Sequence, residues 1–148
     1  GGDVLSGGGG EDIIKAGHGR DVITGGNGGD TLFGGFGHNI FTGEKDGEVD
    51  TISFKSDQHL WNWLYGKAGN NTDGSKLDVI HSLDANDKIQ IQGVETSELS
   101  FKSISSFSGP TGNYSGIGIY SDGFLEAIYT GGDLNSSQLK SMTVGVDI

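Results

Sequence analysis

Hydrophobic and polar positions recur with a fixed nine-residue period over the first third of the chain. From Gly7 to Thr42 the sequence divides into GGGGEDIIK, AGHGRDVIT, GGNGGDTLF and GGFGHNIFT, and a partial copy, GGDVLS, precedes them. Each copy has Gly or Ala at place one, Gly at places two and four, and Asp or Asn at place six. Place eight is always large and apolar, in the series Leu5, Ile14, Ile23, Leu32 and Phe41. The constant phase indicates one structural unit repeated along the chain.

Each unit predicts a glycine-rich turn followed by a short strand. Side chains alternate between the two faces of a strand, so place eight faces a core if the chain is extended from place six to place nine. Glycines at places one, two and four allow positive φ and let backbone carbonyls crowd toward one point. Carbonyl and carboxylate oxygens are the ligands that Ca²⁺ prefers. The prediction is an all-β fold, a parallel β-roll with an aliphatic filling and a row of calcium ions along each edge.

Other glycine-rich classes fit this stretch poorly. A flexible linker would not keep an apolar residue at one phase in five copies. Collagen needs Gly at every third residue and abundant Pro, whereas this chain has one Pro. A phosphate-binding loop needs Gly-Lys-Ser or Gly-Lys-Thr after its glycines, and neither tripeptide occurs in the sequence.

Composition and charge agree with a divalent cation as the partner. The 148 residues include 20 acidic and 9 basic side chains, for a formal net charge of -11. This charge argues against nucleic acid and anionic membranes as ligands. The chain has no Cys, so no disulfide or thiolate metal site contributes. We see no cleavable signal peptide or long apolar run, and a start in mid-repeat suggests a longer parent protein.

Residues 44–148 predict a β-rich region that caps the roll of residues 1–43. Strands are expected at 51–54, at 77–83 and 88–94 around the turn 84–87, and at 97–107. A break at 108–113 precedes a hairpin of 117–120 with 124–129. One short helix, capped by Asn135 or Ser136 and ending at Met142, precedes a last apolar strand.

Three segments of this region leave alternatives open. The acidic turn with Glu44, Asp46, Glu48 and Asp50 either caps the last calcium row or is a solvated loop. A cluster of Asp78, Asp84 and Asp87 either binds another calcium or, as we favour, forms a simple acidic turn. Residues 58–66 read as a strand or a helical turn, and Trp61, Trp63 and Tyr65 either seal the core, the interpretation we favour, or form a platform for sugars.

The nonapeptide GGxGxDxUx resembles the hemolysin-type calcium-binding repeat of the RTX family of secreted bacterial proteins. The order of GGxGxNxF, a DxIxxLxxxDKIxI pattern at 78–91 and a late hairpin is similar to the carboxy-terminal module of serralysin-type metalloproteases and other type I secreted proteins. The resemblance implies an ion between turns two repeats apart. Carbonyls of places two and four and the place-six carboxylate of one turn would face carbonyls of places one and three and the carboxylate of the other.

By this resemblance, one complete site pairs Gly8, Gly10 and Asp12 with Gly25, Asn27 and Asp30. A truncated site pairs Gly1 and Asp3 with Ala16, His18 and Asp21. A weaker site, because Asn39 is neutral, pairs Gly17, Gly19 and Asp21 with Gly34, Phe36 and Asn39. A fourth set, Gly26, Gly28 and Asp30, faces Gly43 and the acidic turn.

The resemblance further implies a secreted, extracellular or cell-surface module that leaves the cell unfolded through type I secretion machinery and folds on external calcium. The last residues, 144–148, are compatible with an uncleaved secretion signal. The scattered histidines form no zinc-protease motif, and no Gly-x-Ser-x-Gly elbow is present, so we interpret the fragment as non-catalytic. The alternatives are a module that binds extracellular polysaccharide and a cell-surface structural element.

Overall fold

The computed structural model describes residues 1–42, 45–56, 77–109 and 111–146. Most of these residues lie in strands, and the predictions for Gly43, for Glu44, for the aromatic segment 58–66 and for residues 147–148 fall outside them. The strands are β1 (Val4–Gly9), β2 (Ile13–Lys15), β3 (His18–Gly19), β4 (Val22–Asn27), β5 (Thr31–Gly37), β6 (Ile40–Thr42), β7 (Thr51–Lys55), β8 (Asp78–Ile80), β9 (Lys88–Gln92), β10 (Leu99–Gly109), β11 (Gly112–Ser121), β12 (Phe124–Tyr129) and β13 (Thr143–Val146). A 3₁₀ turn (Thr96–Glu98) and helix α2 (Ser136–Met142) complete the elements.

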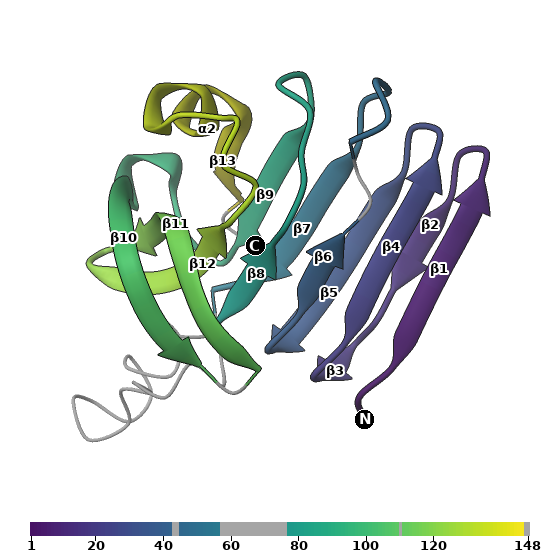
Figure 1. Ribbon diagram of the computed structural model, residues 1–148, viewed down its shortest axis with the longest axis horizontal. Helices are drawn as coiled ribbons and strands as arrows, with labels where there is room; N and C mark the ends of the chain where they lie inside the picture. Colours follow the sequence, from purple (N-terminus) through teal and green to yellow (C-terminus); the bar gives the residue numbers. More distant parts are fainter. Residues whose placement is uncertain (43–44, 57–76, 110, 147–148) are drawn as a thin grey trace.

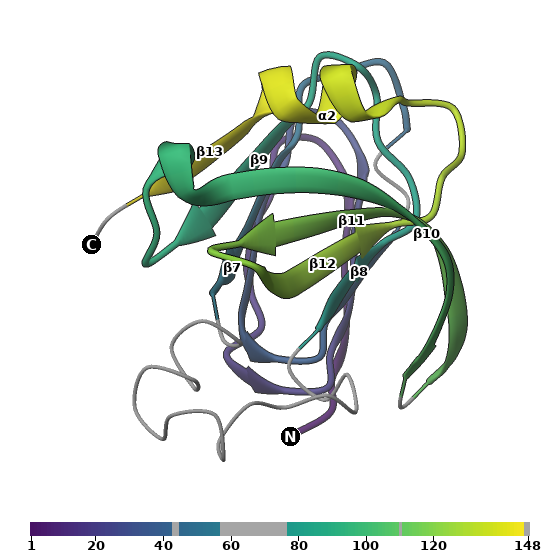
Figure 2. The same ribbon diagram turned by 90° about the vertical axis from the view of Figure 1, so that its left-hand side faces the viewer.

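The strands form two sheets that face each other across the core (Figures 1 and 2). We call the sheet with the order β1-β4-β6-β8-β12-β11-β10 the front sheet. The back sheet has the order β13-β9-β7-β5-β2, and β3 pairs with β5. Successive repeats therefore enter the two sheets alternately, with β1 and β4 in the front sheet and β2 and β5 in the back sheet.

Pairing within the repeats is parallel and keeps one register. Leu5 lies beside Ile23, Ile23 beside Phe41, and Ile14 beside Leu32, so each strand pairs with the strand two repeats later. Beyond the repeats the same parallel pairing continues with longer insertions, from Leu32 to Ile52 and from Ile52 to Ile89. Across the described residues, a mostly β arrangement with parallel strands and one short helix is thus confirmed.

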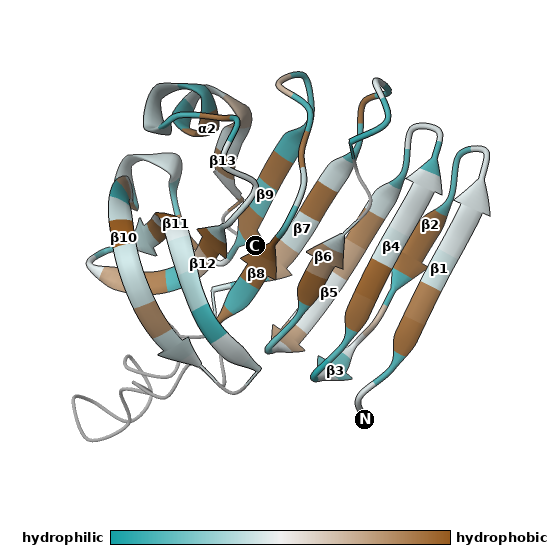
Figure 3. Ribbon diagram, viewed as in Figure 1, coloured by the Kyte–Doolittle hydropathy of each residue, from teal (hydrophilic) through white to brown (hydrophobic). Residues whose placement is uncertain are grey.

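The place-eight residues supply the core as predicted. Ile23, Leu32 and Phe41 are fully buried, and Ile52, Ile80 and Ile89 continue the same inward rows after the repeats. The rings of Phe41 and Phe54 meet across the two sheets at 6.2 Å. Leu5 and Ile14 are only partly buried because they belong to the first strands of their sheets. Figure 3 shows these apolar bands crossing neighbouring strands.

Glycine is required in the turns for two different reasons. Places two and four have positive φ in every full repeat, for example 106° at Gly26 and 117° at Gly28. Place one does not, so the prediction of positive φ there is wrong. A Cβ at Gly25 would instead lie 2.3 Å from the Oδ2 of Asp30, so Gly25 is required for space rather than for an unusual conformation, whereas the second copy has Ala16 at this place.

The carboxy-terminal elements cover one end and one outer face of the sheets. The β10–β11 hairpin forms the end of the front sheet and curls back over the outer face of that sheet (Figure 2). There Tyr114, Ile104 and Phe107 pack with Val79 and Ile128 in a second apolar cluster. The predicted hairpin of β11 and β12 is present, with Asp122 and Gly123 at positive φ in its turn. Strand β10 extends to Gly109 and β11 begins at Gly112, so both strands extend into the expected break at 108–113.

Helix α2 and the turn 84–87 complete the fold. Asn135 caps the helix, as expected, and Leu139 and Met142 are buried in the main core. The turn 84–87 joins β8 and β9, but β8 belongs to the front sheet and β9 to the back sheet, so the two strands do not pair with each other. Among the described residues, no helix is long and apolar enough to span a membrane.

Candidate metal centre

Two rows of side chains run along the starts of the parallel strands, one row for each sheet. The row at the back sheet, which we call the second aspartate row, consists of Asp12, Asp30, Asp50 and Asp87. The backbone N–H of each member donates to the Oδ1 of the next, at 2.9 Å from Asp12 to Asp30 and at 2.8 Å for the two later steps. Each carbonyl in turn accepts from the residue that follows the next aspartate, as between Asp12 O and Thr31 N at 2.8 Å.

The row at the front sheet, which we call the first aspartate row although one member is an Asn, consists of Asp3, Asp21, Asn39 and Asp78. Asp3 N donates to Asp21 Oδ1 at 2.8 Å, and Asn39 N donates to Asp78 Oδ1 at 3.0 Å. Between these two steps the backbone link persists from Ile40 N to Asp21 O at 2.8 Å. Both amide atoms of the fully buried Asn39 side chain lack a hydrogen-bond partner within the described ranges.

The second carboxylate oxygens of the rows have the burial and charge that a bound cation would compensate. Within the part of the chain that the structure describes, the Oδ2 atoms of Asp12, Asp21, Asp30 and Asp50 are buried and have no hydrogen-bond partner. A buried carboxylate oxygen without a donor is costly unless a cation compensates its charge. The donor set of carboxylate oxygens beside glycine carbonyls fits Ca²⁺.

The predicted carbonyl ligands also converge between turns two repeats apart. A Cβ at Gly26 would lie 2.0 Å from Gly8 O, and one at Gly28 would lie 2.1 Å from Gly10 O. Gly10 N donates to Asn27 O at 2.8 Å. The residues of the complete predicted site, from Gly8 to Asp12 and from Gly25 to Asp30, are therefore brought together.

The other predicted sets are assembled to different degrees. In the truncated set, the amino terminus of Gly1 donates to His18 O at 3.1 Å. In the set with Asn39, Gly17 O accepts from Phe36 N at 2.9 Å. A carbonyl oxygen has two lone pairs, so these bonds leave one lone pair for an ion. In the fourth set, Gly28 N donates to Asp46 Oδ2 at 2.8 Å, and Gly43 lies outside the described residues.

The ions would depend on backbone ligands as well as carboxylates. No group of three or more His, Cys, Asp or Glu side chains among the described residues is arranged to hold a metal. Two carboxylates from neighbouring turns and several carbonyls would therefore make up the six to eight oxygens of a calcium site.

Burial and mutual repulsion raise the pKa of three carboxyl groups of the second row, those of Asp30, Asp50 and Asp87. Burial is the main cause that raises the pKa of Asp50 and of Asp87 to about 6, and the neighbouring carboxylates add to it. Burial likewise raises the pKa of Asp30, with further contributions from Asp12 and Asp46. The raised pKa values mean that the folded structure disfavours the ionised form of these carboxyl groups unless a cation lies beside them.

The acidic turn is tied to the loop before α2 by the ion pair of Lys45 with Asp133. Lys45 Nζ and Tyr129 OH both donate to the carboxylate of Asp133. The hydrogen bond from Lys45, followed by that from Tyr129, lowers the pKa of Asp133 to about 2. Lys45 thus joins the turn 45–50 to the loop before α2, and Tyr129, which is buried in the main core, holds the Asp133 carboxylate that Lys45 contacts.

Sequence analysis missed part of the rows. The sequence places Asp50 in an acidic turn that either caps the last calcium row or is a solvated loop, and it groups Asp78 with Asp84 and Asp87. In the structure Asp78 belongs to the first row, whereas Asp87 belongs to the second. The available signal was an Asp two places before an inward Ile, as in Asp50 with Ile52, Asp78 with Ile80, and Asp87 with Ile89.

The comparison with protein families decides the identity of the repeat region. The model of the RTX calcium-binding nonapeptide repeat, in four copies, matches residues 1–32 and 17–46. Residues 1–46 belong to the RTX repeat family. The RTX match stops just before Asp50, so it does not include the last rungs of the second row. None of the curated proteins compared matches the chain.

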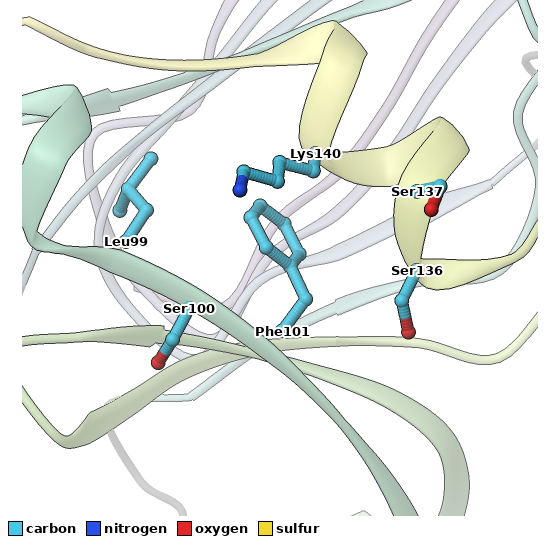
Figure 4. A pocket seen from close by; sticks show the side chains of 6 residues that line it. All are labelled: Leu99, Ser100, Phe101, Ser136, Ser137 and Lys140. Atoms are coloured by element: carbon cyan, nitrogen blue, oxygen red, sulfur yellow. The ribbon is translucent and has the colours of Figure 1, made fainter.

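A separate hollow of about 260 Å³ lies between the start of β10 and helix α2 (Figure 4). Its lining residues are Leu99, Ser100, Phe101, Ser136, Ser137 and Lys140. No residue of the RTX repeats and no sequence-predicted ligand lines it, so it is distinct from the aspartate rows.

Proposed function

We propose that this chain is a calcium-binding RTX module that folds as a parallel β-roll when it meets extracellular calcium. The observation that carries the proposal is the buried Oδ2 of Asp12, Asp21 and Asp30, none of which has a hydrogen-bond partner among the described residues. These atoms lie within the residues that match the RTX repeat. Ca²⁺ between successive turns would neutralise the rows and satisfy these oxygens.

Folding and ion binding would be one event. Without calcium the acidic rows repel each other, and the glycine-rich turns regain more backbone entropy than other residues would. Each site held at ten times its dissociation constant adds about 1.4 kcal/mol of stability. Three such sites would add about 4 kcal/mol, a large fraction of the stability of a small domain.

Circular dichroism during a calcium titration tests this proposal, with magnesium as the control ion. We expect β-structure to appear cooperatively with a midpoint of roughly 0.1 to 1 mM calcium, the range of extracellular modules. Asp12→Ala or Asp30→Ala should raise the midpoint about tenfold, equivalent to about 1.4 kcal/mol. Asp122→Asn, in the exposed β11–β12 turn, is the control: it removes a carboxylate outside the rows, keeps a residue type that tolerates positive φ, and should leave the midpoint unchanged. A chelated sample as structured and heat-resistant as the calcium-loaded one would overturn the proposal.

We also propose, from the family resemblance, that the module is secreted by a type I system and stabilises an upstream domain. Residues 1–43 would form the roll, and residues 44–148 would form the cap with the secretion signal. Substituting residues 144–148 by a Gly-Ser sequence in a strain with a type I transporter should abolish export. Unchanged export would remove residues 144–148 from the proposed signal. The module itself is proposed to be non-catalytic.

A second candidate function is the binding of an acidic extracellular polysaccharide. The back sheet favours it, because strands β2, β5, β7 and β9 contain no acidic residue. Lys15 lies over the ring of Phe33 at 5.6 Å, and Lys55 lies over Phe36 at 5.8 Å. His18 stacks on Phe36 at 5.2 Å, and Gln92 Nε2 donates to Ser53 Oγ at 2.8 Å. Lysines beside aromatic rings and amides complement a chain of carboxylated sugars.

Calorimetric titration with polygalacturonate at constant calcium tests the second candidate, with dextran as the neutral control. Binding to polygalacturonate should weaken in Lys15→Gln/Lys55→Gln by about tenfold. Lys102→Gln/Lys140→Gln removes two charges outside the back sheet and should bind as the original chain does. Equal binding of dextran, or equal loss in the two double variants, would exclude this face as the site.

A further inference from the structure

The turn GGNGGD contains the only Asn-Gly pair of the sequence, Asn27 and Gly28. Asn27 is the last residue of β4 and is exposed, so water reaches its side-chain amide. A glycine has no Cβ to hinder the approach of its backbone nitrogen to the preceding side chain. An Asn that precedes Gly is therefore chemically labile, and this pair is the place in the chain where a side-chain amide is most easily lost.

The reaction needs only water as a co-reactant. Gly28 N attacks Cγ of Asn27, so a bond forms between these two atoms while the bond from Cγ to the amide nitrogen breaks. The amide nitrogen takes the proton from Gly28 N and leaves as ammonia, and the two residues close into a cyclic imide. Water opens this imide at either carbonyl, which gives an aspartyl or an isoaspartyl residue at position 27.

Two hydrogen bonds hold the peptide group between Asn27 and Gly28 in the folded chain. At one end Gly28 N donates to Asp46 Oδ2 at 2.8 Å, and at the other end Asn27 O accepts from Gly10 N at 2.8 Å. The attacking nitrogen must lose its proton, whereas a carboxylate that accepts from this N–H stabilises the protonated form. The peptide group must also turn toward the Asn27 side chain, and that rotation breaks both hydrogen bonds.

The turn is also closely packed against the preceding coil. A Cβ at Gly28 would lie 2.1 Å from Gly10 O, so the backbone at this position has little room to rotate. The fold therefore opposes the reaction at the attacking atom and at the backbone that carries it, although the Asn27 side chain is exposed.

We propose that Asn27 is a site of spontaneous deamidation, and that the contact of Gly28 N with Asp46 in the folded chain suppresses the reaction. The inference rests on the proposed calcium-dependent folding, because this contact forms only when the turns are stacked. In the isoaspartyl product the main chain runs through Cβ and Cγ, and the former backbone carbonyl becomes a free carboxylate. That carbonyl accepts from Gly10 N and is a predicted calcium ligand, so the modified chain loses part of the complete predicted site.

Deamidation is measured by mass spectrometry of the tryptic peptide that follows Arg20 and ends at Lys45, after incubation in mildly alkaline buffer with calcium or with EDTA. We expect the reaction to be about tenfold faster in EDTA, equivalent to about 1.4 kcal/mol of protection by the fold. Asn27→Gln should abolish the fast mass gain and so identify the residue, because Gln closes the cyclic imide much more slowly. Absence of deamidation in EDTA, over a time in which a short GGNGGD peptide is deamidated, would overturn the site.

Two variants of the acidic turn test the role of Asp46. Asp46→Ala removes the acceptor of Gly28 N and should be deamidated about tenfold faster than the original chain in calcium. Glu48→Ala removes a carboxylate from the same turn, leaves that hydrogen bond in place, and should react as the original chain does. Circular dichroism at saturating calcium establishes that each variant is folded. If Asp46→Ala does not fold, Asp46→Asn, which keeps an oxygen acceptor without the charge, takes its place and should also react faster.

The outcomes separate this inference from the proposed function. Equal rates in calcium and EDTA, for a chain that circular dichroism shows to fold with calcium, would overturn the protection by the fold. Equal rates in the folded Asp46 variant and the original chain would overturn the role of Asp46. A chain that is fully structured in EDTA would overturn the proposed function instead, and the comparison of the Asp46 and Glu48 variants would still decide whether the contact with Gly28 N suppresses deamidation.

Discussion

At the scale of single residues, the turns leave no room for side chains where one coil meets the next. Gly26 has a φ of 106°, and a Cβ there would lie 2.0 Å from the carbonyl oxygen of Gly8. Both the conformation and the contact with backbone exclude other residues. Gly29, in the same turn, has no positive φ, and its nearest contact would be Val49 O at 3.1 Å.

Gly26→Ala should therefore destabilise the calcium-loaded chain by about 1–3 kcal/mol, the cost of a strained left-handed residue. Because the clash also moves the carbonyl of Gly8, the calcium midpoint should rise. Urea unfolding at saturating calcium measures the first effect, and a calcium titration measures the second. Gly29→Ala is the control with a much smaller effect, and equal losses in the two variants would contradict the assignment of strain to place two.

At the scale of elements, the cap is fixed by a short helix whose start depends on one side chain. Asn135 Oδ1 accepts from Gln138 N, and Gln138 Oε1 accepts from Asn135 N, each at 2.9 Å. A helix of seven residues has few internal hydrogen bonds, so capping and the burial of Leu139 and Met142 hold it in place. The helix in turn covers the end of the main core.

Asn135→Ala should lower the free energy of unfolding by about 1 kcal/mol through loss of the cap. Asn135→Ser keeps an oxygen acceptor and should retain most of the stability. Chemical unfolding at saturating calcium measures both variants. Equal stability of Asn135→Ala and the original chain would show that packing alone places the helix.

At the scale of the whole molecule, the buried aspartates make stability depend on pH when calcium is absent. Burial raises the pKa of Asp50 and of Asp87 to about 6, compared with an ordinary 3.8. Between these values the folded state binds more protons than the unfolded state. The free energy of unfolding of the calcium-free chain therefore falls as the pH rises toward 6, and above pH 6 it stays lower than at acidic pH.

A chelated sample should accordingly show more β-structure and a higher urea midpoint at pH 5 than at pH 7.5. The double variant Asp50→Asn/Asp87→Asn should lose most of this difference, because its side chains do not titrate. Circular dichroism in EDTA at the two pH values measures the effect. Greater stability of the chelated chain at pH 7.5 would contradict the sign that burial gives.

The sequence by itself determined the repeating part of the protein. A nine-residue period with glycine at fixed places constrains both turn and strand, so Ile23, Leu32 and Phe41 could be assigned to the core and Asp12 and Asp30 to neighbouring turns. Local signals also sufficed for the β11–β12 turn and for the helix that begins after Asn135. These features depend on residues close together in the chain.

Only the tertiary structure decided how the row continues after the repeats. Asp50 and Asp87 are 37 residues apart, and the lengths of the intervening segments do not reveal that their strands are neighbours. The assignment of Asp78 to one row and Asp87 to the other follows from β8 and β9 entering opposite sheets. The physical reason is that parallel pairing joins distant segments through backbone hydrogen bonds, which leave only a two-residue Asp-to-Ile spacing as their trace in the sequence.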